Sequence, residues 1–155
     1  MKFKIIACIN NNNVLGKDNS LIYNIKNDLS NFKRITMDGV VVMGRKTWES
    51  LPDKYKCGRT VVVFSQKHRL SQGVWISSLA EYEKLSLDSP FLIGGAELFD
   101  YFFQQNLLKA CFVTHIQKTY PGDTYFPVKH LLGWKRKRIR QTENFAIYYY
   151  ENYAD

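Results

Sequence analysis

The sequence has few cysteines, and those it has are scattered. Cys8, Cys57 and Cys111 are the three cysteines among 155 residues, and they form no C-x-x-C pair. A disulfide framework or a zinc site would need paired or closely spaced thiols, so neither is expected to organise this chain. Isolated thiols are typical of a reducing compartment, and we therefore expect the protein to be cytoplasmic.

Long apolar runs and metal-ligand spacings are also missing. No stretch of about eighteen apolar residues occurs, so no membrane-spanning segment is expected. The N-terminal stretch MKFKIIACINNNN has an apolar run too short for a signal peptide, and we interpret it as a first strand. His68, His115 and His130 show no metal-ligand spacing, so no metal site is expected.

What the sequence does contain is typical of one packed globular domain. Hydrophobic residues make up 45% of the chain and aromatic residues 15%, which is enough to build a core. No repeat, linker or low-complexity segment divides it, and the tract 10–13 reads as a polar loop. We expect a single domain over residues 1–155.

The charge is unbalanced, with a formal net value of +8. The basic residues are most concentrated in Lys135-Arg-Lys-Arg138, followed by Arg140. Such a run indicates either a polyanion partner or the solvated face of a strand. No zinc finger, helix-turn-helix pattern or aromatic-interleaved motif accompanies it in the sequence, so a nucleic-acid partner is not expected.

Apolar runs alternate with helical patterns along most of the chain. The runs that predict strands lie at 3–9, 40–43, 60–64, 74–77, 90–93, 110–116, 134–139 and 146–152. The patterns that predict helices lie at 24–36, 45–50, 79–86 and 96–104. Alternation of this kind favours parallel strands joined by helical crossovers. The last two strands have no helix between them, so the sequence predicts an α/β fold: a mixed, mostly parallel sheet flanked by helices, with an antiparallel C-terminal strand pair.

Three of the predicted strands end in residues that suit an anion. Gly44-Arg45-Lys46-Thr47 follows one strand, Ser65-Gln66-Lys67 follows the next, and Gly94-Gly95 opens a helix after a third. Glycine allows close approach of the backbone, and helix starts and cations favour negative charge. Because ligands collect at the carboxyl ends of strands in open α/β sheets, the three segments predict one ligand with several phosphates. The G-x-G-x-x-G dinucleotide motif is absent.

One acidic residue lies on an apolar helix face. In NIKNDLSNFKRIT the apolar positions Ile25, Leu29 and Phe32 share a face, and the spacing puts Asp28 on it. A carboxylate there needs a partner or a raised pKa. The pattern leaves two interpretations open: an acid that binds an amino-substituted heterocycle, or a first-turn residue that stabilises the helix.

At this point several motifs together resemble dihydrofolate reductase of the bacterial single-domain kind. They cover nearly the whole chain: Val14-Leu15-Gly16, Asp28-Leu29 with Phe32-Lys33, Met43-Gly44-Arg45-Lys46-Thr47-Trp48-Glu49-Ser50, Gly58-Arg59, Ile93-Gly94-Gly95, Thr114-His115-Ile116 and Gly122-Asp123-Thr124-Tyr125-Phe126-Pro127. The resemblance implies reduction of 7,8-dihydrofolate to tetrahydrofolate by hydride transfer from NADPH, in support of one-carbon metabolism and thymidylate synthesis. It also implies binding of antifolate inhibitors and a monomer.

The resemblance implies roles for individual residues. The catalytic group comprises Asp28, which would pair with the pterin ring, together with Tyr23 and Thr114. Arg59 would bind the glutamate carboxylate of the substrate, and the other substrate-binding positions are Ile6, Ala7, Leu29, Phe32, Lys33, Leu51 and Ile93. The cofactor-binding positions are Ala7, Leu15, Gly16, Asn19, Leu21, Gly44, Arg45, Lys46, Thr47, Ser65, Gln66, Lys67, Ile93, Gly94, Gly95, Ala96, Glu97, Leu98 and Phe99.

Four positions depart from the family pattern. Ile22-Tyr23 stands where the family usually has proline and tryptophan, Phe99 where many relatives have tyrosine, and Ala96 where a third glycine is common. Two other interpretations are a related reductase acting on a ribosyl-pyrimidine and a basic nucleic-acid-binding module. The reductase alternative would not need Asp28 or Arg59, and both residues are present.

Overall fold

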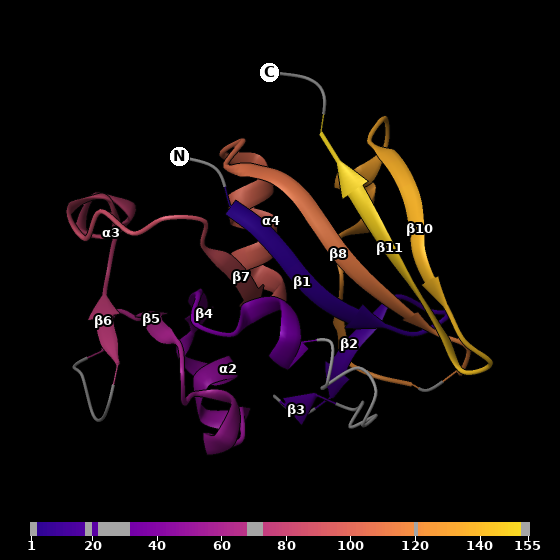
Figure 1. Ribbon diagram of the computed structural model, residues 1–155, viewed down its shortest axis with the longest axis horizontal. Helices are drawn as coiled ribbons and strands as arrows, with labels where there is room; N and C mark the ends of the chain where they lie inside the picture. Colours follow the sequence, from indigo (N-terminus) through magenta and orange to yellow (C-terminus); the bar gives the residue numbers. More distant parts are fainter. Residues whose placement is uncertain (1–2, 18–19, 22–31, 68–72, 120, 153–155) are drawn as a thin grey trace.

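The computed structural model describes residues 3–17, 20–21, 32–67, 73–119 and 121–152. Eight strands form one sheet in the order β10-β11-β8-β1-β7-β4-β5-β6. Five of its seven strand pairs are parallel, and only β8–β11 and β10–β11 are antiparallel. The predicted mixed α/β fold with an antiparallel C-terminal strand pair is thereby confirmed (Figure 1).

The strand bounds follow the apolar runs closely. The strands of the large sheet are β1 (Phe3–Ile9), β4 (Val40–Gly44), β5 (Thr60–Phe64), β6 (Val74–Ile76), β7 (Phe91–Gly94), β8 (Leu108–Ile116), β10 (Lys135–Gln141) and β11 (Phe145–Glu151). β4 reads VVVMG because its residues meet apolar neighbours on both faces. Val40 and Val42 pack into one core cluster, and Val41 and Met43 pack into the other. This period of two is the geometry of a central strand.

The helices are short and cover both faces of the sheet. They are α2 (Arg45–Ser50), η1 (Asp53–Tyr55), α3 (Leu79–Lys84), α4 (Ala96–Gln104) and η2 (Val128–Leu131). α3 begins at a capped turn, in which the Ser78 hydroxyl accepts a hydrogen bond from the Glu81 amide at 3.2 Å. The Glu81 carboxylate accepts hydrogen bonds from the Ser77 amide and hydroxyl, so local contacts fix the residue at which α3 begins. Of the predicted helix at 24–36, residues 32–36 are helical and the remainder lies outside the described residues.

A second, three-stranded sheet was not predicted. It joins β3 (Ser20–Leu21), β2 (Val14–Lys17) and β9 (Thr124–Tyr125). The tract 10–13 before it forms a turn whose first residue, Asn10, is buried at 1% exposed, whereas residues 11 and 12 are exposed. The Asn10 side-chain oxygen accepts hydrogen bonds from the amides of Asn12 at 2.8 Å and Val14 at 3.0 Å. The predicted polar loop is therefore an ordered turn, stabilised by the Asn10 side chain, that leads into β2.

Candidate active site

A cavity of about 560 Å³ lies at the carboxyl ends of β4, β5 and β7. Its lining combines three segments that are remote in the sequence with one residue of β2 and one of β9. The lining residues are Leu15, Gly44, Arg45, Lys46, Thr47, Ser50, Phe64, Ser65, Gln66, Lys67, Ile93, Gly94, Gly95, Ala96, Glu97, Leu98, Phe99 and Thr124. The three anion-suited strand ends thus meet in one place, because β7, β4 and β5 are neighbours in parallel register.

Three cations line the cavity: Arg45, Lys46 and Lys67. A nitrogen of the Arg45 guanidinium lies 2.6 Å from a Glu49 carboxylate oxygen, one helical turn further along α2. The loop after β5 is held by two hydrogen bonds: the Lys67 amide donates to the Ser65 hydroxyl, and the Gln66 side chain donates to the Ser77 carbonyl. The cations therefore stand on short, locally fixed segments.

The glycine at the end of β7 allows two helix starts to approach each other. Gly44 caps α2 and Gly95 caps α4, and neither start has a side-chain capping bond. Gly94 has a φ of +144°, and a Cβ added there would lie 3.0 Å from the Thr47 hydroxyl oxygen. A side chain at this position would therefore be strained and would crowd Thr47, which explains why β7 ends in glycine. The peptide bond between Gly94 and Gly95 is cis.

A second group of predicted residues surrounds Arg59. Its guanidinium donates to the Thr36 hydroxyl at 2.7 Å, the Cys57 carbonyl at 2.7 Å and the Lys33 carbonyl at 3.3 Å. These bonds use one N–H of each nitrogen, so one N–H on each terminal nitrogen remains among the donors that guanidinium carries. Burial lowers the pKa of Arg59 below its ordinary value, although guanidinium stays protonated.

Apolar side chains lie next to this arginine. The Arg59 guanidinium lies 5.3 Å from the centre of the Phe32 ring, and that ring makes an edge contact with Tyr55 at 6.0 Å. Phe32 and Ile93 pack against the core cluster that contains Leu51 and Tyr55. The arrangement joins a fixed cation to an apolar wall, which suits a ligand with a ring and a carboxylate.

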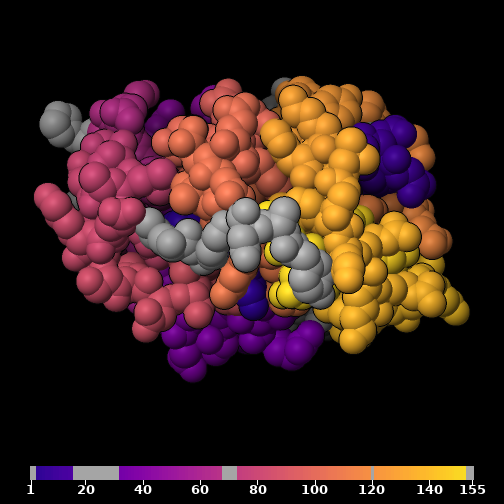
Figure 2. Space-filling model, turned by 90° about the horizontal axis from the view of Figure 1, so that it is seen from above, coloured from indigo at the N-terminus to yellow at the C-terminus, as the bar shows by residue number. Residues whose placement is uncertain are grey.

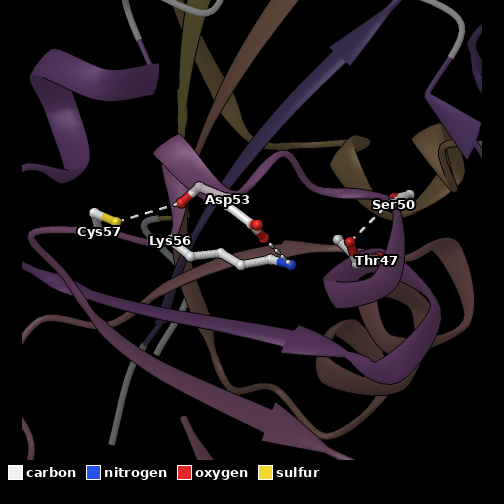
Figure 3. Close-up of polar contacts among 5 residues, drawn as sticks. All are labelled: Thr47, Ser50, Asp53, Lys56 and Cys57. Atoms are coloured by element: carbon white, nitrogen blue, oxygen red, sulfur yellow. Dashed lines mark hydrogen bonds and ion pairs between the residues drawn. The ribbon is translucent and has the colours of Figure 1, made fainter. Parts of the chain in front are cut away.

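The segment between α2 and Arg59 is braced by polar contacts (Figure 3). The Ser50 hydroxyl donates to the Thr47 carbonyl at 3.0 Å, which closes the end of α2. The Lys56 ammonium lies 3.3 Å from an Asp53 carboxylate oxygen and 3.9 Å from the centre of the Trp48 ring. η1 is thereby tied back to α2, so the phosphate-suited loop and the Arg59 segment share one support.

Most of the positions predicted for a cofactor line the cavity. Ala7 is buried in β1 and is not in the lining, Gly16 and Leu21 are in the small sheet, and Asn19 lies outside the described residues. The sequence prediction missed Ser50, Phe64 and Thr124. Phe64 is the last residue of a strand whose loop was singled out, so it could have been found. Thr124 reaches the cavity through the unpredicted sheet.

The positions predicted for substrate and catalysis are only partly described. Thr114 is buried in β8, and its register partner in β1 is Cys8. Ile6 pairs with Phe112 two residues earlier on the same strands. Lys33 is exposed, and its carbonyl accepts from Arg59. The acid predicted to bind the ring, Asp28, lies outside the described residues, as do Tyr23 and Leu29.

No metal site or membrane helix emerges from the described parts of the chain. No group of three or more His, Cys, Asp or Glu residues there could hold a metal ion. No helix among those residues is long and apolar enough to cross a membrane. Cys8, Cys57 and Cys111 are free thiols.

The fold and the cavity together define the class: an α/β protein whose ligand site lies at the carboxyl ends of parallel strands, the usual place for nucleotides. The family model for dihydrofolate reductase matches residues 2–153. A dihydrofolate reductase of Buchnera aphidicola subsp. Baizongia pistaciae is 34% identical over 97% of this chain and 94% of its own length. That of Haemophilus influenzae is 36% identical over 92% of this chain and 88% of its own. The Bacillus subtilis enzyme is 33% identical over 84% of this chain and 78% of its own.

The chain belongs to the dihydrofolate reductase family. It is an oxidoreductase whose reaction is the reduction of dihydrofolate to tetrahydrofolate. The family uses a nicotinamide cofactor and binds dihydrofolate and antifolates. The resemblance noted in the sequence is thereby confirmed.

Proposed function

We propose that this chain uses NADPH as its hydride donor and that the cavity beside Arg45, Lys46 and Lys67 holds that cofactor. The observation that carries the proposal is the meeting of three cations and the Gly94–Gly95 junction in one cavity. Its volume of about 560 Å³ lies within the range of small-molecule sites. When bound, the nicotinamide group supplies the hydride, and the protein supplies orientation and exclusion of water.

The cavity residues divide by chemistry. Ser65, Gln66 and Lys67, with Arg45 and Lys46, would meet the 2′-phosphate and its neighbours. Gly44, Thr47 and the backbone of Gly95, Ala96, Glu97 and Leu98 would meet the pyrophosphate. Apolar contact with the remaining parts would come from Leu15, Ile93 and Phe99, together with Phe64, which also lines the cavity. Ala7, Gly16, Asn19 and Leu21 keep the cofactor roles that the resemblance implies.

The substrate would lie beside the Arg59 group. Arg59 has two N–H donors beyond its three internal bonds, and a carboxylate takes two donors from one guanidinium. Leu29, Phe32, Leu51 and Ile93 would form the apolar walls, with Ile6, Ala7 and Lys33 at the remaining substrate positions. Asp28 would form charge-assisted hydrogen bonds with the protonated substrate ring. Tyr23 and Thr114 would complete the catalytic group.

We also propose that residues 1–155 form one domain that acts as a monomer in the cytoplasm. The two large core clusters share the strands of one continuous sheet, which supports a single domain. Three free thiols fit a reducing compartment.

The cofactor proposal is tested by comparing NADPH with NADH in the wild type and in the double variant Lys46→Ala, Lys67→Ala. NADH lacks the 2′-phosphate, so a site built for that group leaves cations unneutralised. Each charge-assisted hydrogen bond contributes about 1.5–3 kcal/mol, so we expect wild-type kcat/KM to favour NADPH by roughly a hundredfold or more. The double variant should lose most of that preference while keeping its kcat/KM for NADH.

The matched control is Lys54→Ala, Lys84→Ala, which removes two exposed lysines that do not line the cavity. The control variant should keep the wild-type preference for NADPH over NADH. It removes as much positive charge as the cavity variant does, so a difference between the two variants is not an effect of net charge. Equal losses for NADPH and NADH in the cavity variant would show that these lysines do not recognise the 2′-phosphate.

A further inference from the structure

The basic run has no part in the proposed active site. It forms β10, at one end of the large sheet, whereas the cavity lies at β4, β5 and β7. Three strands separate β7 from β10 in the sheet order, which corresponds to about 19 Å across the sheet. Figures 1 and 2 both show the C-terminal hairpin at the opposite end of the molecule from α3 and β6. The cofactor therefore does not account for this concentration of charge.

All seven residues of β10 are exposed, including the consecutive cations Arg136, Lys137 and Arg138. Charges on an edge strand also protect it against pairing with other chains, and this role alone would explain a few lysines. Edge protection does not explain the residues that β11 places opposite these cations.

The strand register places a tyrosine across from each of the three cations. Arg136 pairs with Tyr150, Lys137 with Tyr149 and Arg138 with Tyr148. The sequence contains no aromatic-interleaved motif in this run, because the rings are contributed by the neighbouring strand. Because successive residues of a strand point to opposite faces, Arg136, Arg138, Tyr148 and Tyr150 share one face of the hairpin, and Lys137 and Tyr149 lie on the other. Antiparallel pairing of the two strands thus places cations beside rings on each face, a juxtaposition that neither segment has by itself.

The contacts on one face of the hairpin show how these groups lie. The Arg136 guanidinium is 4.6 Å from the centre of the Tyr148 ring, and the centres of the Tyr148 and Tyr150 rings are 6.5 Å apart. His115 of β8 makes an edge contact with Tyr148 at 5.1 Å, which continues the aromatic surface inward. Arg138 also hydrogen-bonds Gln141 at 3.5 Å and so stays within this face.

We propose that the β10–β11 hairpin binds single-stranded nucleic acid. Guanidinium groups pair with phosphates through two parallel bonds, and half-buried tyrosine rings offer faces on which bases stack. An acidic polypeptide would use the cations equally well but would gain nothing from the rings. The juxtaposition of the two groups therefore favours a nucleic acid over an acidic protein.

The experiment is fluorescence anisotropy with a fluorescein-labelled twelve-nucleotide oligothymidylate. Saturating NADPH is present throughout, so that the anion-suited cavity does not bind the probe. We expect wild-type protein to bind in low salt, with affinity that falls as salt rises. The variant Arg136→Gln, Lys137→Gln, Arg138→Gln should bind at least tenfold more weakly. Its slope of log affinity against log salt should be smaller by at least about 1.4, given roughly 0.7 per phosphate contact in single strands and two arginines on the described face.

Two further variants separate this surface from general charge. The triple variant Lys84→Gln, Lys109→Gln, Lys129→Gln removes the same charge from exposed positions outside β10 and should bind like the wild type. Tyr148→Leu should weaken binding about fivefold or more without changing the salt slope, because it removes a ring and no charge. Circular dichroism and dihydrofolate turnover, neither of which depends on β10 side chains, report whether each variant is folded.

Three results would overturn the proposal. One is the absence of probe binding by the wild type in low salt, which would leave β10 with edge protection alone. Another is an equal loss of affinity in the two triple variants. The third concerns competition: if polyglutamate displaces the probe as effectively, per charge, as unlabelled oligothymidylate does, the surface binds acidic polypeptides.

Discussion

At the scale of single residues, Arg59 shows how folding fixes a side chain that we propose binds the substrate. Three hydrogen bonds, to Thr36, Cys57 and Lys33, fix the guanidinium, and the Phe32 ring lies beneath it. The entropy of a long side chain is thus lost on folding rather than on binding. A lysine in this place would supply a point charge without the planar fork that binds a carboxylate through two parallel bonds.

Arg59→Lys should raise the Michaelis constant for dihydrofolate by roughly tenfold or more and leave kcat nearly unchanged, because it removes uniform binding of the substrate tail. Steady-state kinetics with each substrate varied in turn measures this. The control is Arg136→Lys on β10, which should change neither constant. A weaker binding of NADPH with unchanged dihydrofolate binding would assign Arg59 to the cofactor instead.

Tyr82 places a hydroxyl group inside the core. Its side chain is 1% exposed and packs on Phe3, and its hydroxyl has no hydrogen-bond partner within the described structure. Burial, with a smaller effect of Asp88, raises the pKa of Tyr82 to about 12. Because the unfolded chain releases this proton near pH 10, the free energy of unfolding should fall as pH rises from about 10 towards 12.

Tyr82→Phe should remove that part of the alkaline destabilisation. At pH 7 the variant should be as stable as the wild type or more stable by about 1 kcal/mol, since an unpaired buried hydroxyl is costly. Urea unfolding at pH 7, 9.5 and 10.5 gives the difference, which should grow by up to about 1.4 kcal/mol per pH unit above 10. Parallel stability profiles for the two proteins would contradict the prediction.

At the scale of elements, the geometry of the proposed cofactor cavity depends on how closely α2 approaches the junction of β7 and α4. Each of these helices starts directly after a strand, and each begins at a glycine. The approach is set by Gly94, whose missing side chain leaves room for Thr47 of α2. A contact between two elements is thus encoded by the smallest residue in the chain.

Gly94→Ala should lower the free energy of unfolding by about 1–3 kcal/mol and weaken NADPH binding, because it combines a positive φ with crowding of Thr47. Adding Thr47→Ala should restore part of the stability by removing the crowded hydroxyl but not the backbone strain. The matched control is Gly133→Ala, whose φ is +84° with no atom within 4 Å of the added Cβ. Gly133→Ala should lower the free energy of unfolding by about 1 kcal/mol and leave NADPH binding unchanged. Equal effects of the two alanines on cofactor binding would refute the role of the contact.

At the scale of the whole molecule, the sheet order separates two positively charged regions. Parallel pairing of β7, β4 and β5 brings the carboxyl ends of these strands to one edge, where the cavity forms. The antiparallel hairpin β10–β11 continues the same sheet at the far end, with its own row of cations. One sheet can therefore carry the proposed cofactor cavity and a separate charged surface, because several strands lie between them.

The sequence alone determined the elements that have strong local signals. Apolar runs such as VVVM at 40–43 and TVVVF at 60–64 are long and β-branched, so they predict strands whatever surrounds them, and β4 and β5 follow these runs closely. The bounds of α2 and α4 also agree with prediction, because a glycine stands before each helix, and in α4 apolar periodicity follows. Cation-bearing strand ends indicated a phosphate ligand, and the linear motifs indicated the family.

Only the tertiary structure decided which distant residues meet. β2, β3 and β9 are two to four residues long, too short for a periodic signal, and they exist because they pair with one another. Thr124 joins the cavity lining through that pairing, and the three bonds of Arg59 link residues up to 26 positions apart. The juxtaposition of cations and tyrosines on β10 and β11 is likewise absent from either segment. Local sequence encodes backbone preference, whereas strand register and packing bring remote side chains together, and this chain's binding surfaces depend on both.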